Sequence, residues 1–161
     1  MDKIINKKNK GISLIEVLIG LSILLVSLVS VISTYNFFLK VANNNTEVIK
    51  AEFLLEEGIE SIRFVRDKSW SDFSNIPVDT SHYLAFQGNS WSSTTTDPYI
   101  DGFFERSYIL NNVYRDANDD IAEIGVLDEG IKKVTVFVSW PNSGSTSTLS
   151  TSVYLANLFD N

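Results

Sequence analysis

Residues 10–39, KGISLIEVLIGLSILLVSLVSVISTYNFFL, form the most apolar stretch of this 161-residue chain. The 23 residues from Val17 to Leu39 carry no charge, and about 20 such residues in a helix are enough to cross a bilayer. Cysteine is absent, which excludes disulfides, cysteine-based zinc sites and thiol catalysis. We therefore expect a membrane-inserted N-terminal helix, followed by a domain that is long enough to bury its own core.

Charge is distributed unevenly on the two sides of Gly11. Residues 1–11 contain four of the 13 basic side chains and one of the 20 acidic ones, so their net charge is +3 and that of residues 12–161 is −10. Lysines in front of an apolar helix keep that end in the cytoplasm and place the remainder of the chain outside it. The acidic remainder is a poor match for a phosphate backbone, so we expect no general nucleic-acid binding.

Two general interpretations of this N-terminus compete. A cleaved secretory signal peptide has an apolar core of roughly 7–15 residues and a small-residue cleavage site, whereas this apolar run is longer and includes Glu16. An ordinary single-pass membrane anchor fits both the length and the charge pattern.

Residues 10–16, KGISLIE, carry a more specific pattern, in which a basic leader ends in Gly11 and a glutamate stands fifth in the apolar run that follows. This pattern resembles the processing site of type IV prepilins and pseudopilins. The resemblance implies that a prepilin peptidase removes residues 1–11 and that the new N-terminus, Ile12, is methylated. Ile12 stands where the family more often has phenylalanine, and no proline interrupts the helix, although many major pilins carry one there.

Glu16 is the one charged residue between Gly11 and Leu39. A carboxylate in a membrane helix costs roughly 2–3 kcal/mol near the centre of the bilayer and less near an end, so such residues are functional candidates. The family resemblance implies a role in filament assembly, in which Glu16 pairs with the free amine of Ile12 on a neighbouring subunit. The alternative is that the side chain simply reaches the headgroup region. Gly20, Ser27, Ser30 and Thr34 form a stripe of small residues that suits helix packing in lipid.

An amphipathic helix is predicted beyond the apolar run. Val48, Leu55, Ile59 and Ile62 recur at helical spacing, with Phe53 and Val65 beside them, and together predict a stripe that faces a core. We expect one nearly continuous helix from Ile12 to about Arg66, bent or loosened at residues 43–45, because asparagine is a poor helix former. The glutamates of this segment are interpreted as a solvated face; they are Glu52, Glu56, Glu57 and Glu60.

Strands follow the helix. Period-two alternation predicts strands at residues 134–140 and 149–155, joined by a turn at residues 141–144 into a hairpin. Residues 103–113 form a third candidate, residues 82–87 and 121–126 are weaker ones, and residues 90–96 are predicted to be a mobile loop. The fold class is therefore α+β, with the second half of the long helix packed on an antiparallel sheet.

The resemblance extends over most of the chain. Residues 51–70, 101–106, 132–140 and 151–157 look like segments of minor pilins of the same class. The organisation it implies is a cleaved leader at residues 1–11, a membrane-spanning helix at residues 12–40 and an extracytoplasmic pilin-like domain at residues 41–161. Trp70 and Trp140 are interpreted as packing residues.

The sequence offers little catalytic material. His82 is the single histidine, and no nucleophile elbow or glycine-rich phosphate loop is present. Asp116, Asn118 and Asp120 have the alternating oxygen spacing of calcium loops, but the rest of the EF-hand pattern is missing. A related calcium loop and a plain solvated turn are the two alternatives, and we expect no other cofactor and no enzymatic activity.

The sequence thus predicts a structural subunit of a type IV pilus or pilus-like filament. As a precursor it would be a single-pass protein of the cytoplasmic membrane with its N-terminus in the cytoplasm, and when mature it would lie outside the cytoplasm. The expected partners are other pilin subunits through the N-terminal helix, the prepilin peptidase, the pilus assembly platform and the membrane. The alternatives are a pseudopilin of a secretion or DNA-uptake machine, or a non-polymerising single-pass protein that displays a binding domain.

Overall fold

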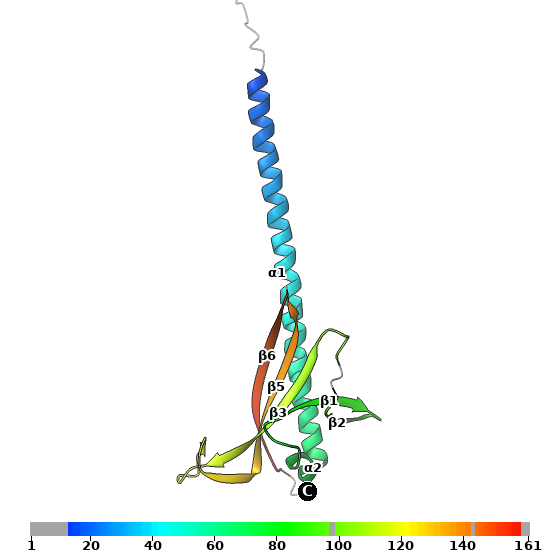
Figure 1. The fold of residues 1–161 in the computed structure, drawn as a ribbon, viewed down its shortest axis with the longest axis vertical. Coiled ribbons are helices and arrows are strands. Elements are labelled where there is room, and N and C mark those ends of the chain that lie inside the picture. The colour runs from blue at the N-terminus through cyan, green and yellow to red at the C-terminus, as the bar shows by residue number, and fades with distance from the viewer. Residues whose placement is uncertain (1–12, 97–98, 143, 159–161) are drawn as a thin grey trace, which may run out of the picture. The chain divides into compact units, whose positions relative to one another are not determined.

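The computed structural model describes residues 13–96, 99–142 and 144–158. Helices α1 (Leu14–Lys68) and α2 (Trp70–Ser74) precede the strands (Figure 1). The strands are β1 (Ser81–Gln87), β2 (Ser90–Thr94), β3 (Glu105–Arg115), β4 (Ile121–Ala122), β5 (Val126–Asn142) and β6 (Ser145–Ala156). The chain divides into two compact units, of which the first ends at Asn45 and the second begins at Thr46.

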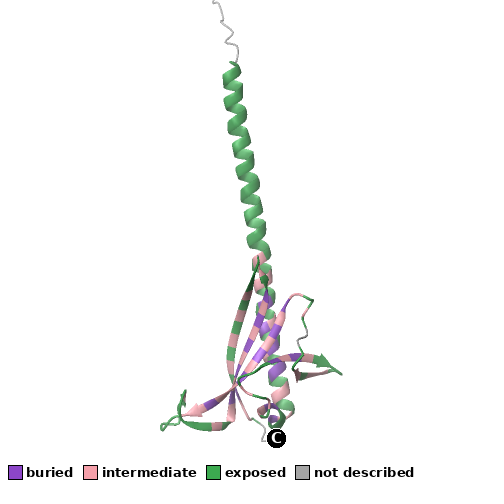
Figure 2. Ribbon diagram, viewed as in Figure 1, coloured by how far each residue is buried: buried purple, intermediate pink, exposed green. Residues whose placement is uncertain are grey.

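The first unit is the leading part of α1, and its residues are almost entirely exposed (Figure 2). The predicted long helix is confirmed from Leu14 onward, and Ile12 lies outside the described residues. Asn43, Asn44 and Asn45 are helical in spite of their poor propensity. The boundary between the two units nevertheless falls immediately after them.

The second unit combines the end of α1 with one antiparallel sheet. Within the described residues the strand order is β2-β1-β3-β5-β6, and the short β4 pairs with the end of β3. Every neighbouring pair is antiparallel, and β5 is joined to β6 by the predicted hairpin. This arrangement confirms the α+β class with the helix preceding the sheet.

The core lies between α1 and the inward-facing residues of the sheet. The predicted stripe is confirmed at Leu55 and Ile62, which are buried, and at Val48 and Ile59, which are partly buried. The prediction missed the small residues Ala51, Gly58 and Ser61, which are buried on the same face of α1. The strand residues of the core come from β1, β3, β5 and β6; they are Leu84, Tyr108, Leu110, Val134, Val136, Val138, Trp140 and Leu155.

Gly58 is the point of closest approach between α1 and the sheet. A Cβ atom at this position would lie 2.9 Å from Val136 Cγ1 and 3.1 Å from Arg106 Cδ. The missing side chain lets the aliphatic stem of Arg106 run under the helix while its Nη1 donates to Glu57 Oε2 at 2.6 Å and to the carbonyl of Leu54 at 3.3 Å. The sequence predicts that Glu57 belongs to a solvated face. The structure shows instead that Glu57 ties α1 to β3 through its bond with Arg106.

The interpretation of residues 90–96 as a mobile loop is wrong, because Ser90–Thr94 form strand β2. Gly88 and Asn89 both have positive φ, of 58° and 63°, and form the two-residue turn that favours a tight hairpin. Trp91 stabilises the hairpin, since its ring packs on Phe86 and under the guanidinium of Arg106, whose Cζ lies 5.3 Å from the ring centroid. These contacts stabilise residues 90–94 as a strand although most of these residues are polar.

Helix α2 is a second element that the apolar pattern does not reveal. Ser69 caps it, with its hydroxyl accepting the backbone N–H of Asp72 at 3.1 Å. Trp70 and Phe73 are buried and their rings lie 5.5 Å apart, which confirms the packing role of Trp70. Trp140 is likewise buried, at 3% exposed, and packs on Phe104.

We expect Gly58→Ala to destabilise the protein although alanine is the better helix former. The propensity gain is about 1 kcal/mol, whereas overpacking against the fully buried Val136 costs roughly 1–3 kcal/mol. Chemical denaturation should show a lower free energy of unfolding, and the double variant Gly58→Ala/Val136→Ala should lose less stability than the two single changes added together. Glu56→Ala, on the exposed face, is the control and should leave stability within about 0.5 kcal/mol. A stabilised Gly58→Ala protein would contradict the close approach.

Candidate functional site

The first turn of α1 holds Glu16. The carbonyl oxygen of Ser13 accepts the backbone N–H groups of Glu16 at 2.9 Å and Val17 at 3.3 Å, so the helix begins immediately before this turn. A carboxylate in the first turn interacts favourably with the positive end of the helix dipole. Within the described residues Glu16 is exposed and its carboxylate has neither an ion-pair nor a hydrogen-bond partner.

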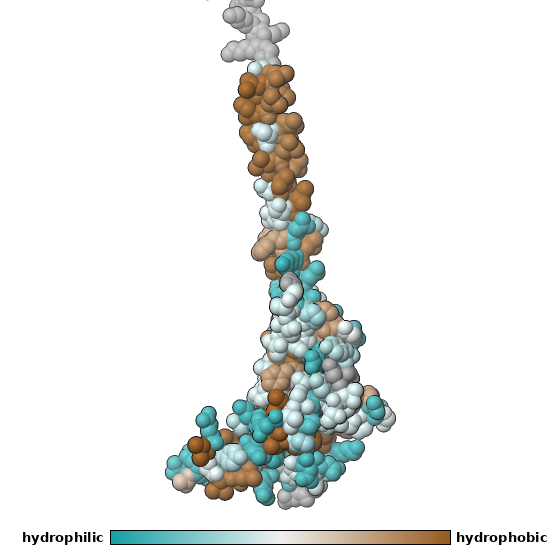
Figure 3. All heavy atoms as spheres, in the orientation of Figure 1, coloured by the Kyte–Doolittle hydropathy of each residue, from teal (hydrophilic) through white to brown (hydrophobic). Residues whose placement is uncertain are grey.

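Apolar side chains surround the helix on all sides after Glu16. The large hydrophobic side chains between Leu14 and Leu39 are 44–79% exposed, and most of the helix surface on the face shown in Figure 3 is apolar, with paler patches between the apolar residues. By length and composition α1 is able to cross a membrane. This part of α1 therefore presents an apolar surface that suits the interior of a membrane.

Four hydroxyl groups of this segment, those of Ser22, Ser27, Ser30 and Thr34, are bonded within the helix itself. Ser22 and Ser27 donate to carbonyl oxygens three residues earlier, both at 2.8 Å. Ser30 and Thr34 donate to carbonyl oxygens four residues earlier, both at 2.9 Å. Because each donor is satisfied locally, these small residues can lie in lipid or against another helix without an unpaired polar group.

The basic leader and the start of this helix match a known sequence family. Residues 6–32 match the family described as "Prokaryotic N-terminal methylation motif". The N-terminus is type IV prepilin-like. A prepilin-like N-terminus implies processing by a prepilin peptidase, and together with the apolar helix it fits a membrane-anchored precursor.

The match covers the N-terminal segment alone. No similar curated protein and no similar solved structure was found for the chain. Gly11 and Ile12, the predicted cleavage and methylation residues, fall inside the matched segment but outside the described residues. Glu16 lies in the same matched segment, and its role in assembly remains a prediction.

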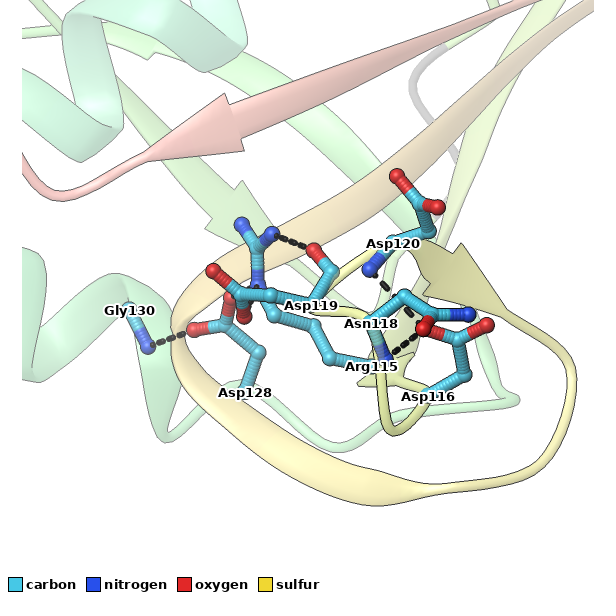
Figure 4. A network of polar contacts seen from close by, with 7 residues as sticks. All are labelled: Arg115, Asp116, Asn118, Asp119, Asp120, Asp128 and Gly130. Atoms are coloured by element: carbon cyan, nitrogen blue, oxygen red, sulfur yellow. Dashed lines mark hydrogen bonds and ion pairs between the residues drawn. The ribbon is translucent and has the colours of Figure 1, made fainter.

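The second candidate site is the acidic loop between β3 and β4. Figure 4 shows Asp116 turned toward the backbone of its own loop. One of its carboxylate oxygens, Oδ1, accepts the N–H of Asn118 at 2.8 Å and that of Asp120 at 3.0 Å. These hydrogen bonds hold the pKa of Asp116 below its ordinary value. The predicted ligand Asp116 thus closes a turn, and its carboxylate faces the backbone N–H groups of Asp120 and Asn118.

Arg115 and Asp128 form an ion pair at the base of this loop, which the sequence pattern does not reveal. The guanidinium Nε lies 2.6 Å from Asp128 Oδ2, and Nη1 donates to the carbonyl of Asp119 at 2.6 Å. The bond from Arg115 lowers the pKa of Asp128, and the same bond raises the pKa of Arg115. The two residues meet because β3 and β5 pair across a register shift between Asn112 and Val113, which spacing along the chain cannot show.

Metal binding by this loop stays a prediction. In the part of the chain that the structure describes, no group of three or more histidine, cysteine, aspartate or glutamate side chains is placed to hold a metal ion together. His82 lies elsewhere, buried in β1, where its Nε2 is 2.9 Å from the carbonyl oxygen of Pro77 and its ring packs on Tyr108. Its surroundings are those of a core residue.

Low pH should lower the stability of the folded second unit, because Asp128 becomes protonated. Its pKa is lower in the folded than in the unfolded chain, so its stabilising effect is complete above the unfolded pKa and is lost as pH falls through the folded value. We expect Asp128→Asn to lower the melting temperature at neutral pH. Between about pH 5 and about pH 3, the melting temperature of this variant should fall less than that of the wild type. Glu123→Gln, an exposed change between β4 and β5, is the control for charge removal. Parallel pH profiles of Asp128→Asn and wild type would rule out this origin of acid sensitivity.

Proposed function

We propose that the protein is a structural subunit of a type IV pilus or pilus-like filament, made as a membrane-anchored prepilin. The observation that carries the proposal is the methylation motif at residues 6–32, which includes the start of α1, a helix whose large apolar side chains between Leu14 and Leu39 are 44–79% exposed. Cleavage after Gly11 and N-methylation of Ile12 turn the precursor into a subunit. The chemistry is performed on this protein, which is itself not an enzyme.

Two environments fit the exposed part of α1. The four leader lysines keep the N-terminus in the cytoplasm while the helix crosses the bilayer, and the second unit lies outside. In a filament the same surface packs against the helices of other subunits, with the small residues from Gly20 to Thr34 allowing close approach. The assembly platform supplies the transfer between the two environments.

Glu16 provides the docking step in this proposal. In the precursor the nitrogen of Ile12 is locked in a peptide bond, and cleavage turns it into an amine that stays cationic after methylation. A subunit that enters the filament can place this cation against Glu16 of a subunit already there. Desolvation offsets much of the attraction, so the pair fixes register more than it adds net stability.

We favour a minor subunit over a major one, because α1 has no proline and because residues 51–70, 101–106, 132–140 and 151–157 resemble segments of minor pilins. A pseudopilin of a secretion or DNA-uptake machine is the nearest alternative, and it shares the same N-terminal processing. The protein composition of filaments sheared from native cells separates these roles, since a minor pilin should be present at low abundance relative to the major subunit.

Processing gives the first test. The mass spectrum of the native protein should show a chain that begins at N-methyl-Ile12, because Gly11 lets a peptidase close on the carbonyl of a residue without a side chain. Cells that lack the prepilin peptidase should retain the Met1 form. An intact Met1 terminus in cells that contain the peptidase, or cleavage beyond Ile32, would exclude prepilin processing.

Glu16 gives the second test. Glu16→Val makes the helix more apolar, so the variant should still insert in the membrane and be cut after Gly11, but its incorporation into sheared filaments should fall at least tenfold. Asn36→Leu also replaces an exposed polar residue of the same helix with an apolar one, but outside the stripe of small residues, and it should enter filaments normally. Normal incorporation of Glu16→Val would leave Glu16 as a carboxylate at headgroup level and end its docking role.

A further inference from the structure

The residues around β4 form an arm that leaves the main part of the sheet and is coloured yellow in Figure 1. β3 and β5 pair in regular register up to Asn112↔Lys132. Their pairing resumes at Val113↔Asp128, so three residues of β5 are skipped. Such an irregularity bends a pair of strands. The arm comprises residues 113–129, and its tip is the segment from β4 to the start of β5.

The tip of the arm carries exposed aliphatic side chains. Ile124 is 88% exposed, the highest fraction among the large hydrophobic residues that the structure describes, and Val126 is 77% exposed. Ile121 and Leu127, which are close to them in the chain, are also exposed. Folded domains seldom leave several large apolar side chains together on one surface unless another molecule contacts them. The tip is therefore a candidate contact surface.

Acidic residues surround this apolar tip. Between residues 116 and 129 the chain has six carboxylates and no basic side chain; the carboxylates are Asp116, Asp119, Asp120, Glu123, Asp128 and Glu129. Arg115 at the base of the arm pairs with two of them, since its Nε lies 2.6 Å from Asp128 Oδ2 and 3.6 Å from Asp119 Oδ1. The arm therefore suits a partner that offers an apolar side chain together with cations, and it would repel an anionic surface such as nucleic acid or an acidic lipid headgroup.

Exposed basic side chains occur at two places in the described part of the second unit. Lys50 is at the first place, where it lines a groove together with Glu57 and Asp101, so its surroundings are acidic. Arg63 and Lys68 are at the second place, which is the end of α1. The end of α1 is therefore the better match for the charge of the arm.

The end of α1 also carries an exposed aromatic ring. Phe64 follows Arg63 directly and lies one helical turn before Lys68. Arg63 is engaged in an exposed ion pair with Glu60, at 2.6 Å, which water screens. The ammonium group of Lys68 has no ion-pair or hydrogen-bond partner within the described residues. This surface thus combines an apolar side chain with cations that are free to meet the carboxylates of a partner.

The arm and the end of α1 lie at the same end of the second unit. Arg66 Nη1 donates to the carbonyl of Ala156 at 3.5 Å, and Ala156 pairs with Ile131, which lies next to the base of the arm in β5. Two copies that stand side by side in the same orientation therefore bring the arm of one to the level of the α1 end of the other. Their α1 helices run in the same direction, which lets both copies be anchored in one membrane.

We propose that the arm of one copy docks on the end of α1 of a second copy of this chain, with Ile124 and Val126 against Phe64. The carboxylates of the arm then face Arg63 and Lys68 of the second copy. Each copy uses its arm toward one neighbour and its α1 end toward the other, so the contact is heterologous and repeats along a row of copies instead of closing at two. The contact deepens the proposed function, and it rests on that function for the shared orientation of the copies.

Cysteines on two separate copies test the contact, because the chain has no cysteine of its own. Two differently tagged full-length chains, one with Ile124→Cys and the other with Phe64→Cys, are expressed in the same membrane and treated with a short bis-maleimide. The cross-linked product that carries both tags should form in at least fivefold higher yield than when Phe53→Cys replaces Phe64→Cys. Phe53 is an exposed ring on the same helix, about 16 Å before Phe64. Equal yields, or no product with both tags, would overturn the proposal.

Charge exchange gives an independent test of the same contact. Asp120→Lys/Glu123→Lys is added to the copy with the arm cysteine, and Arg63→Glu/Lys68→Glu is added to the copy with the helix cysteine. Each exchange by itself should lower the yield of the product with both tags at least threefold, and the two exchanges together should restore it, because opposite charges meet again. Circular dichroism of the purified chains checks that the variants keep the fold. An unchanged yield in the single exchanges, or no restoration in the combined one, would refute the charge match.

The N-terminal mass of the same chains separates this contact from the proposed function. Chains that are cut after Gly11 but give no product with both tags would exclude the contact and leave the proposed function standing. Chains that keep Met1 but give the product would support the contact and count against prepilin processing.

Discussion

The contact of Arg106 with α1 is the constraint on which the second unit depends. The Arg106 side chain is 5% exposed and joins three elements. It comes from β3, bonds to Glu57 and the carbonyl of Leu54 on α1, and stacks on Trp91 of β2. Arg106 Nε has no partner within the described residues, so part of the attraction is offset by burial. The contact therefore acts mainly by setting where α1 lies on the sheet, and Gly58 makes the room for it.

Much of this fold follows from residue periodicity. The helix, β3 and the β5–β6 hairpin are predicted because apolar residues in these segments repeat at 3.6 or 2 positions. β2 could not be predicted this way, since its polar residues are held by Trp91 and by a tight turn, not by an apolar face. Glu57 looks like its exposed glutamate neighbours in the sequence, and only the pairing of α1 with β3 distinguishes it.

The two candidate sites differ in how much of each could be predicted from the sequence. The residues of the methylation motif could be named from the sequence, because their chemistry depends on a linear pattern that a peptidase reads. The role of Glu16 requires a partner on another chain, which neither the sequence nor one folded copy contains. In the acidic loop, the spacing of Asp116 and Asp120 could not show whether the Asp116 carboxylate faces a cation or the loop's own N–H groups. In the structure, Asp116 Oδ1 accepts two of these N–H groups, and metal binding by the loop remains a prediction.

The uncovered apolar surface of α1 has a consequence for reversibility. Moving residues 14–39 from lipid to a bundle of helices replaces one apolar environment with another. Burial of apolar surface from water therefore contributes little free energy to the exchange in either direction. The hydroxyl groups of Ser22, Ser27, Ser30 and Thr34 keep their partners, because they are bonded within the helix. In the proposed filament, a subunit could then return to the bilayer intact and be used again. The membrane would serve as a reservoir that exchanges subunits with the filament.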